Sequence, residues 1–241
     1  MEKLLLGIVL LGFSLGCAHA GNDMRKDEKI DQYFKIIEKH QKAMGSVIVL
    51  DGEDVAYKRH FTFKSEPKNP IYRIGSLSKI YTATIILQLV EAGKLELETS
   101  VASFYPEIPQ AKKITIEHLL RHRSGLPNYT HKENYEHYFE SQVSSDRQIK
   151  RFSEYQLEFT PGEKYSYSNT GYALLTYIAE KKTGLSYQKL LEKFISVPLE
   201  LEKTFVYDKK NPRKQEVRSY EKEIKWNESS NTHQSVPVGA G

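Results

Sequence analysis

The sequence predicts an α+β fold: an antiparallel sheet flanked by helices, with a mostly helical lobe inserted between two parts of the sheet. Three observations carry this prediction. An amphipathic helical segment is followed by two extended segments around a tight turn, which is typical of a helix next to a β-hairpin. The middle of the chain has helical periodicity, so the remaining strands of the sheet are expected later in the chain. At 241 residues, with 39% apolar side chains, the chain is long enough for one sizeable core.

The first elements are expected before residue 64. Met24–Ala43 is expected to form an amphipathic helix. Residues that share one face of this helix are Ile30, Tyr33, Phe34, Ile37 and Gln41. Ser46–Leu50 and Val55–Phe63 are expected to be strands, joined by the hairpin signal Asp51-Gly52-Glu53-Asp54.

The helical region is expected to begin at Ser76. The helix that starts there is apolar nearly all round, which indicates burial in the middle of a domain, and Gly93 stands where a glycine commonly ends a helix. Further helical segments are expected, the first capped by Thr115 and the second mixed with loops. They are Thr115–Arg121, Asn128–Tyr155, Tyr172–Lys182 and Tyr187–Ile195.

The N-terminus is typical of a targeting segment. Lys3 precedes the apolar run Leu4–Leu15, which is too short to span a membrane, and Ala18-His19-Ala20 has the small-x-small form of a signal-peptidase site. We therefore expect residues 1–20 to be a signal peptide and residues 21–241 to be the folded domain. The single cysteine, Cys17, leaves a second route open because Leu15-Gly16-Cys17 resembles the end of a bacterial lipobox. Either route implies export and a mature domain without a disulfide.

The charge pattern argues against a nucleic-acid partner. The net charge is only +4, and acidic residues follow the densest basic run, Lys209–Lys214. A nucleic-acid-binding domain typically carries a strong basic patch instead.

The most informative motif is Ser76-Leu77-Ser78-Lys79. It places a hydroxyl and an amine three residues apart, on one face of a helix, where the lysine can serve as the base that activates the serine. Ser-x-x-Lys also occurs at three other places, but their context is that of a loop, a helix N-cap and a charged surface stretch. They are Ser65–Lys68, Ser186–Lys189 and Ser219–Lys222. Ser76 alone opens an apolar helix, where the helix dipole favours developing negative charge. The structural alternative is an N-cap serine beside a lysine that reaches solvent.

A second motif, Tyr167-Ser168-Asn169, is the only Tyr-x-Asn in the chain. Alternate residues of an extended segment point the same way, so Tyr167 and Asn169 can both face a cleft, as a proton carrier and a hydrogen-bonding amide. The structural alternative is a packed tyrosine followed by an asparagine N-cap.

A third motif, Lys182-Thr183-Gly184, resembles a catalytic Lys-Thr-Gly. It ends an apolar helix, and Gly184 stands where a C-terminal glycine belongs, so we interpret this motif as structural.

In order and spacing, these motifs resemble the serine β-lactamase-related family, the group of class C β-lactamases, D-alanyl-D-alanine carboxypeptidases and esterases. The resemblance runs from about Lys29 to Gly241 and rests on five stretches. They are Tyr72–Lys79, Leu89–Leu95, Ile114–Pro127, Thr160–Tyr172 and Thr183–Ser186.

The resemblance implies a β-lactamase/transpeptidase-like fold, a small-molecule or peptide substrate as partner, and a site with no metal and no cofactor. Ser76 would be the acylated nucleophile, and its backbone N–H would form half of an oxyanion hole. Lys79 and Tyr167 would share the proton transfers, and Asn169 would orient Lys79 and bind the substrate. His118 and His122 have the i, i+4 spacing of metal ligands, but the resemblance places both in a structural helix.

The family's third motif, Lys-Thr-Gly or His-x-Gly on a late strand, is absent, so the resemblance implies that C-terminal strands are missing. Losing one oxyanion donor typically lowers the rate by about 10²–10³. Two hypotheses stay open. The first is an exported serine hydrolase that forms an acyl-enzyme with D-Ala-D-Ala-type peptides, β-lactams or small esters. The second is a truncated, non-catalytic remnant or binding module of the same fold.

Asn128-Tyr129-Thr130 matches a glycosylation triplet, a pattern that is common by chance.

Overall fold

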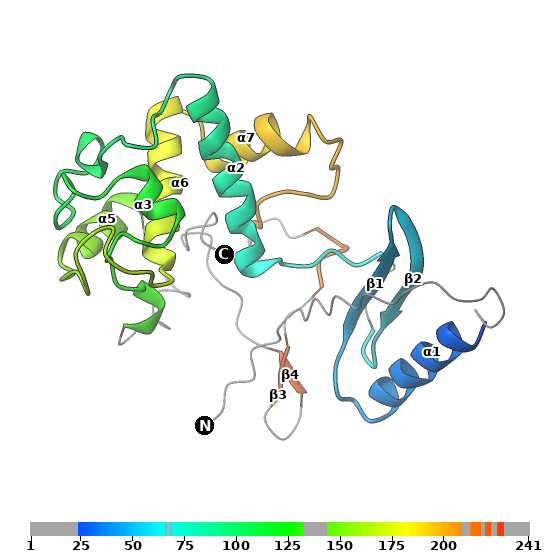
Figure 1. Cartoon of the computed structure of the whole chain (residues 1–241). Coiled ribbons are helices and arrows are strands. Elements are labelled where there is room, and N and C mark those ends of the chain that lie inside the picture. The colour runs from blue at the N-terminus through cyan, green and yellow to red at the C-terminus, as the bar shows by residue number, and fades with distance from the viewer. Residues whose placement is uncertain are drawn as a thin grey trace. The chain divides into compact units, whose positions relative to one another are not determined.

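The computed structural model describes residues 24–65, 67, 69–132, 144–208, 213–217, 220–222 and 226–228. The chain divides into two compact units, Met1–Glu66 and Pro67–Gly241, which are described separately (Figure 1). The predicted signal peptide at residues 1–20 and the lipobox cysteine Cys17 lie outside the described residues and stay predictions.

The first unit contains a helix and a hairpin. Helix α1 spans Met24–Lys39, and strands β1 (Gly45–Asp51) and β2 (Asp54–Phe61) pair antiparallel with an irregularity between Val49 and Leu50. The predicted hairpin is confirmed. The helix ends earlier than the predicted Ala43, because Gln41 adopts a left-handed backbone with φ +49°.

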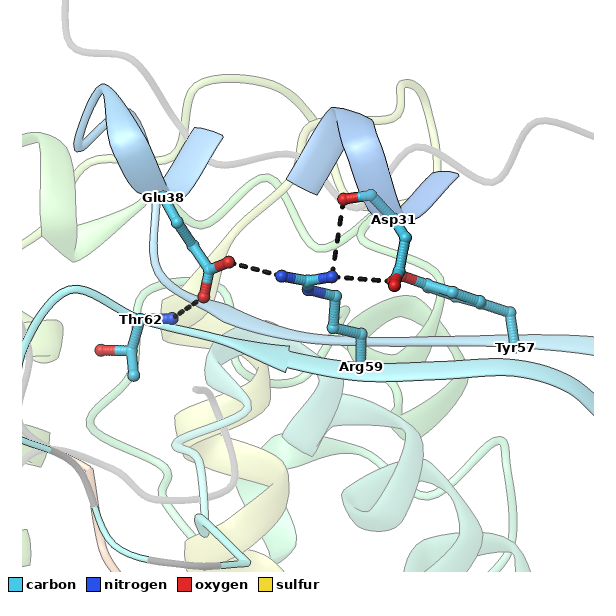
Figure 2. A network of polar contacts seen from close by, with 5 residues as sticks. All are labelled: Asp31, Glu38, Tyr57, Arg59 and Thr62. Carbon is cyan, nitrogen blue, oxygen red and sulfur yellow. Dashed lines mark hydrogen bonds and ion pairs between the residues drawn. The ribbon is translucent and has the colours of Figure 1, made fainter. Parts of the chain in front are cut away.

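A polar network links α1 to β2 (Figure 2). Arg59 Nη1 lies 2.7 Å from Asp31 Oδ1, and Arg59 Nη2 lies 2.5 Å from Glu38 Oε2. The Tyr57 hydroxyl donates to Asp31 Oδ1 over 2.7 Å, and the Thr62 N–H donates to Glu38 Oε1 over 3.0 Å. Phe34 packs beside this network, its ring centroid 4.7 Å from that of Phe61. One face of α1 is therefore fixed to β2 by charge as well as by apolar contact.

The second unit is mainly helical in its described residues (Figure 1). Its elements are η1 (Gly75–Leu77), α2 (Ser78–Glu91), η2 (Val101–Ser103), α3 (Ile116–Leu120), η3 (Tyr129–His131), α5 (Ser145–Ser153), α6 (Asn169–Thr183), α7 (Tyr187–Leu191), the π-helical turn η4 (Glu192–Ser196), β3 (Tyr220–Lys222) and β4 (Trp226–Glu228). Strands β3 and β4 form a second antiparallel pair. None of the helices in the described part of the chain has the length and apolarity that crossing a membrane requires.

Helix α6 forms the centre of this unit and packs against α2, α3, α5 and α7. All residues from Thr170 to Ala179 are buried. Helix α2 contributes Ile85, Ile86 and Leu89, which are fully buried. The prediction that α2 is buried all round is wrong, since Ile80 is 62% exposed and Leu87 is 49% exposed in the described structure. Ile80 and Leu87 lie seven residues apart and therefore share one face of the helix. That face is not the one that packs on α6.

The other predicted helices occur with shifted ends. Thr115 caps α3 as predicted, with His118 completing a capping box. Helix α6 starts at Asn169 rather than Tyr172 because Ser168 is its N-cap, and the predicted helix Tyr187–Ile195 changes from α to π geometry at Glu192. Gly184 ends α6 with φ +72°, which confirms the structural interpretation of Lys182-Thr183-Gly184. Part of the predicted segment Asn128–Tyr155, residues 133–143, lies outside the described residues.

Candidate active site

Ser76 lies in a short 3-10 turn that continues directly into α2. Gly75 permits this turn with φ +52°, a backbone conformation that favours glycine. The Ser76 side chain is exposed, whereas Lys79, one helical turn later, is only 7% exposed. Lys79 Nζ donates to Ser76 Oγ over 3.1 Å. The Ser-x-x-Lys spacing thus brings an accessible hydroxyl next to a sheltered amine.

Tyr167 and Asn169 reach the same place from the start of α6. Ser168 between them is extended, with φ −141° and ψ 118°. Tyr167 Oη lies 2.7 Å from Ser76 Oγ, and Lys79 Nζ donates to Asn169 Oδ1 over 2.7 Å. The structure therefore brings together all four residues that the sequence singled out.

The electrostatics of the site bear on which group can accept a proton. Burial lowers the pKa of Lys79, while hydrogen bonding to Tyr167 and its charge act in the opposite direction. A lowered pKa increases the fraction of neutral amine near neutral pH, and only a neutral amine can accept a proton. The Lys79 ammonium also lies 4.9 Å from the centroid of the Tyr167 ring. The cluster can hold a serine hydroxyl between a phenol and an amine.

A loop before η3 supports Asn169, and sequence reasoning did not assign it this role. Asn128 Oδ1 accepts the Asn169 backbone N–H over 3.2 Å, and Asn169 Nδ2 donates to Thr130 Oγ1 over 3.4 Å. The Pro127 carbonyl accepts from Thr170 Oγ1 over 2.6 Å. Asn128 belongs to the glycosylation-like triplet, but its side chain is only 7% exposed and is used in these contacts. The nearest signal in the sequence is the run Ser124–Pro127, which predicts only the end of the preceding helix.

His122 is a second residue whose place sequence reasoning missed. The prediction that His118 and His122 share a structural helix is wrong for His122, because α3 ends at Leu120 and His122 has a left-handed backbone with φ +54°. His118 does lie in α3 and caps its start, where His118 Nδ1 accepts the Thr115 N–H over 3.4 Å. The His122 ring packs on Tyr167 with 4.6 Å between centroids. In the part of the chain that the structure describes, no group of three or more His, Cys, Asp or Glu side chains is placed to bind a metal.

The fold and this set of side chains define the class of serine β-lactamases and penicillin-binding proteins. The chain belongs to the Beta-lactamase family, whose family model matches residues 28–237. This confirms the resemblance and the fold class expected from the sequence.

Two relatives illustrate the match. The chain is 33% identical to Penicillin-binding protein 4* of Bacillus subtilis over 184 residues, which cover 72% of this chain and 40% of the relative. It is 25% identical to a teichoic acid D-alanine hydrolase of Staphylococcus aureus over 201 residues, which cover 81% of this chain and 48% of that protein. The chain thus matches less than half the length of these two relatives.

Solved structures give the same result. A D-amino acid amidase from Ochrobactrum anthropi SV3, complexed with L-phenylalanine, superposes with a TM-score of 0.71 and 25% identity, covering 89% of this chain and 65% of the amidase. An octameric penicillin-binding protein homologue from Pyrococcus abyssi superposes with a TM-score of 0.71 and 26% identity, covering 87% of this chain and 51% of the homologue.

Proposed function

We propose that this protein is an exported serine hydrolase that forms an acyl-enzyme on Ser76. The observation that carries the proposal is the continuous set of contacts from Tyr167 through Ser76 and Lys79 to Asn169, with distances of 2.7, 3.1 and 2.7 Å. A serine hydroxyl becomes a nucleophile when an adjacent base takes its proton. Ser76 is an exposed residue, so a substrate can approach it.

The proposed reaction has two stages. Ser76 Oγ forms a bond to the substrate's carbonyl carbon, and its proton passes to neutral Lys79, either directly or through the Tyr167 hydroxyl, which gives up its own proton as it accepts the serine's. The carbonyl carbon then loses its bond to nitrogen or oxygen, and the leaving group departs with that proton. In the second stage, water attacks the acyl ester, the free acid leaves and Ser76 regains a proton. Asn169 holds Lys79 by its side-chain oxygen and orients it throughout.

The proposed substrates are D-Ala-D-Ala-type peptides, β-lactams or small esters. Family membership supports this range, and so do the names of the matched proteins, which include a penicillin-binding protein, a teichoic acid D-alanine hydrolase and a D-amino acid amidase. Export is part of the proposal because residues 1–20 have the pattern of a signal peptide. The intact mass of the protein secreted by a bacterial host distinguishes cleavage after Ala20 from lipid attachment at Cys17.

The test is covalent labelling with a fluorescent penicillin and with a fluorophosphonate. The wild type is expected to be labelled on the peptide that contains Ser76, and Ser76→Ala is expected to lose all labelling. Ser78→Ala is the matched control, because Ser78 lies two residues away and its side chain has no role in the proposed reaction. A folded wild type that neither probe labels would contradict the proposal and favour a non-catalytic binding module.

A further inference from the structure

One histidine holds the backbone on both sides of Tyr167. The His122 carbonyl accepts the Ser166 N–H over 2.9 Å, and His122 Nδ1 accepts the Ser168 N–H over 3.2 Å. The His122 ring also lies against the side chains of Tyr167 and Tyr172, with centroid distances of 4.6 and 4.9 Å. The position of the Tyr167 hydroxyl beside Ser76 therefore depends on His122 through backbone and ring together.

The backbone of His122 is itself unusual. Its φ of +54° lies in the left-handed region, which residues with a Cβ atom rarely adopt. The surrounding contacts hold such a conformation in place, and it occurs at functional sites as well as at the ends of helices. Here the left-handed turn just after α3 brings the ring and the carbonyl of His122 to the segment before α6.

The contact with Ser168 requires one form of the imidazole. An Nδ1 atom that accepts a hydrogen bond carries no proton, so the neutral ring must have its proton on Nε2. A charged imidazolium has a proton on both nitrogens and cannot accept from the Ser168 N–H. Protonation of His122 therefore breaks the hydrogen bond between His122 Nδ1 and the Ser168 N–H, which holds the backbone just after Tyr167.

Other groups around the ring also act on its charge. Lys79 from α2, Tyr172 from α6, and Tyr165 and Tyr167 from the segment before α6 face His122. The neighbouring Arg123 donates to the Gly162 carbonyl. Burial of the ring lowers the pKa of His122, and the positive charge of Lys79 lowers it further. The neutral form is thus the one favoured near pH 7.

We propose that neutral His122 is a positioning residue for Tyr167, and that protonation of His122 in acid switches off acylation at Ser76. The activity part of this inference rests on the proposed function. The structural part, the neutral ring bound to the Ser168 N–H, stands on geometry and is tested without turnover.

The first experiment follows the histidine rings of the full chain by ¹⁵N NMR between pH 4 and 8. His122 is expected to be neutral at pH 7 with its proton on Nε2, and to titrate below the ordinary histidine pKa of about 6.5. The Ser168 amide signal is expected to shift with the same midpoint. A proton on Nδ1 at pH 7, or a Ser168 signal that does not follow the ring, overturns the proposal.

The second experiment measures the rate of penicillin labelling against pH. Protonation of either Lys79 or His122 removes the active form, so the logarithm of the wild-type rate is expected to fall with a slope of about two once the pH is below the pKa values of both groups. His122→Asn keeps an acceptor oxygen and tolerates a left-handed backbone, so its slope is expected to stay at about one. His122→Leu has no acceptor and is expected to label at least about tenfold more slowly at pH 7, because a misplaced catalytic group is costly.

The control is His118→Asn, which alters the cap of α3 and is expected to leave the pH slope unchanged. Circular dichroism establishes that each variant is folded. An unlabelled wild type refutes the proposed function, while the NMR titration still decides the placement of His122. A slope of about two in His122→Asn, with the wild type labelled, refutes the acid switch alone.

Discussion

At the scale of single residues, Lys79 illustrates a conflict between stability and chemistry. Lys79 is buried, its amine donates to Ser76 and Asn169, and burial disfavours its charged form. An amine that is costly to charge is a poor contributor to stability, but it is the kind of base that a serine nucleophile needs.

Lys79→Met is therefore expected to separate the two properties. The substitution removes the general base and should lower the labelling rate by about 10²–10⁴. The melting temperature is expected to stay the same or rise, because the side chain no longer has to be desolvated as a cation. Lys182→Met is the control, since Lys182 lies in the last turn of α6 and is exposed. Loss of labelling in Lys182→Met would contradict the structural assignment of Lys182-Thr183-Gly184.

The pH dependence of stability gives a second prediction for Lys79. Its pKa in the folded protein lies below the unfolded value of 10.5. Between these two values the unfolded chain binds more protons than the folded protein, so the free energy of unfolding is expected to rise with pH through this window. Urea titrations at several pH values check this, and Lys79→Met is expected to lack that rise. The same stability slope in both proteins would contradict the assignment.

At the scale of elements, α2 has two faces that respond differently to truncation. Leu89 is fully buried, whereas Leu87, on the same helix, is 49% exposed. Leu89→Ala is expected to lower the free energy of unfolding by about 2–5 kcal/mol because it leaves a cavity in the core. Leu87→Ala is expected to change it by less than about 0.5 kcal/mol. Chemical denaturation measures both, and equal losses would mean that a partner covers the Leu87 face.

Two glycines with a left-handed backbone offer a comparison: Gly125 in the loop between α3 and η3, and Gly93 just after α2. Gly125 has φ +78°, and a Cβ atom there would lie 2.2 Å from the Phe159 carbonyl oxygen. Gly93 has φ +66°, but apart from its chain neighbours no described atom lies within 4 Å of its Cβ position. Gly93→Ala is expected to cost about 1–2 kcal/mol from backbone conformation alone. Gly125→Ala is expected to cost about 1–3 kcal/mol more, because the backbone must also move. Denaturation of both variants checks the difference, and similar costs would contradict the close contact at Gly125.

The elements and the four candidate catalytic residues were largely predictable, because each depends on local spacing. Ser76 and Lys79 share a helical turn, and an extended Ser168 lets Tyr167 and Asn169 reach the same site. His122 was not predictable from its spacing to His118, because that spacing favours a helix and nothing in Arg121-His122-Arg123 signals a left-handed backbone. Nor does local sequence pattern indicate that the loop around Asn128 contacts the start of α6 from 41 residues away.

At the scale of the whole molecule, the two units are stabilised differently. The described core of the second unit is apolar and centres on α6. In the first unit, Arg59 has 17% side-chain exposure and joins two carboxylates of α1. Acid affects charged pairs far more than apolar packing, so the units are expected to respond differently to low pH.

As the pH falls, we expect the contact between α1 and β2 in the first unit to be lost before the packing of α6 in the second unit. The hydrogen bonds from Tyr57 and Arg59 lower the pKa of Asp31 from its usual value of 3.8. A carboxylate with a lowered folded pKa stabilises the protein above its unfolded pKa, and this stabilisation is lost as the pH falls through the folded pKa. Hydrogen exchange, corrected for its intrinsic rate, should therefore show α1 losing protection below pH 3.8 while α6 keeps it. Asp31→Asn keeps an acceptor for Tyr57 but has no charge, so α1 should be less protected at pH 5 and the acid-dependent loss should be smaller. Loss of protection in α6 before α1 would show that the Arg59 network does not set the acid response.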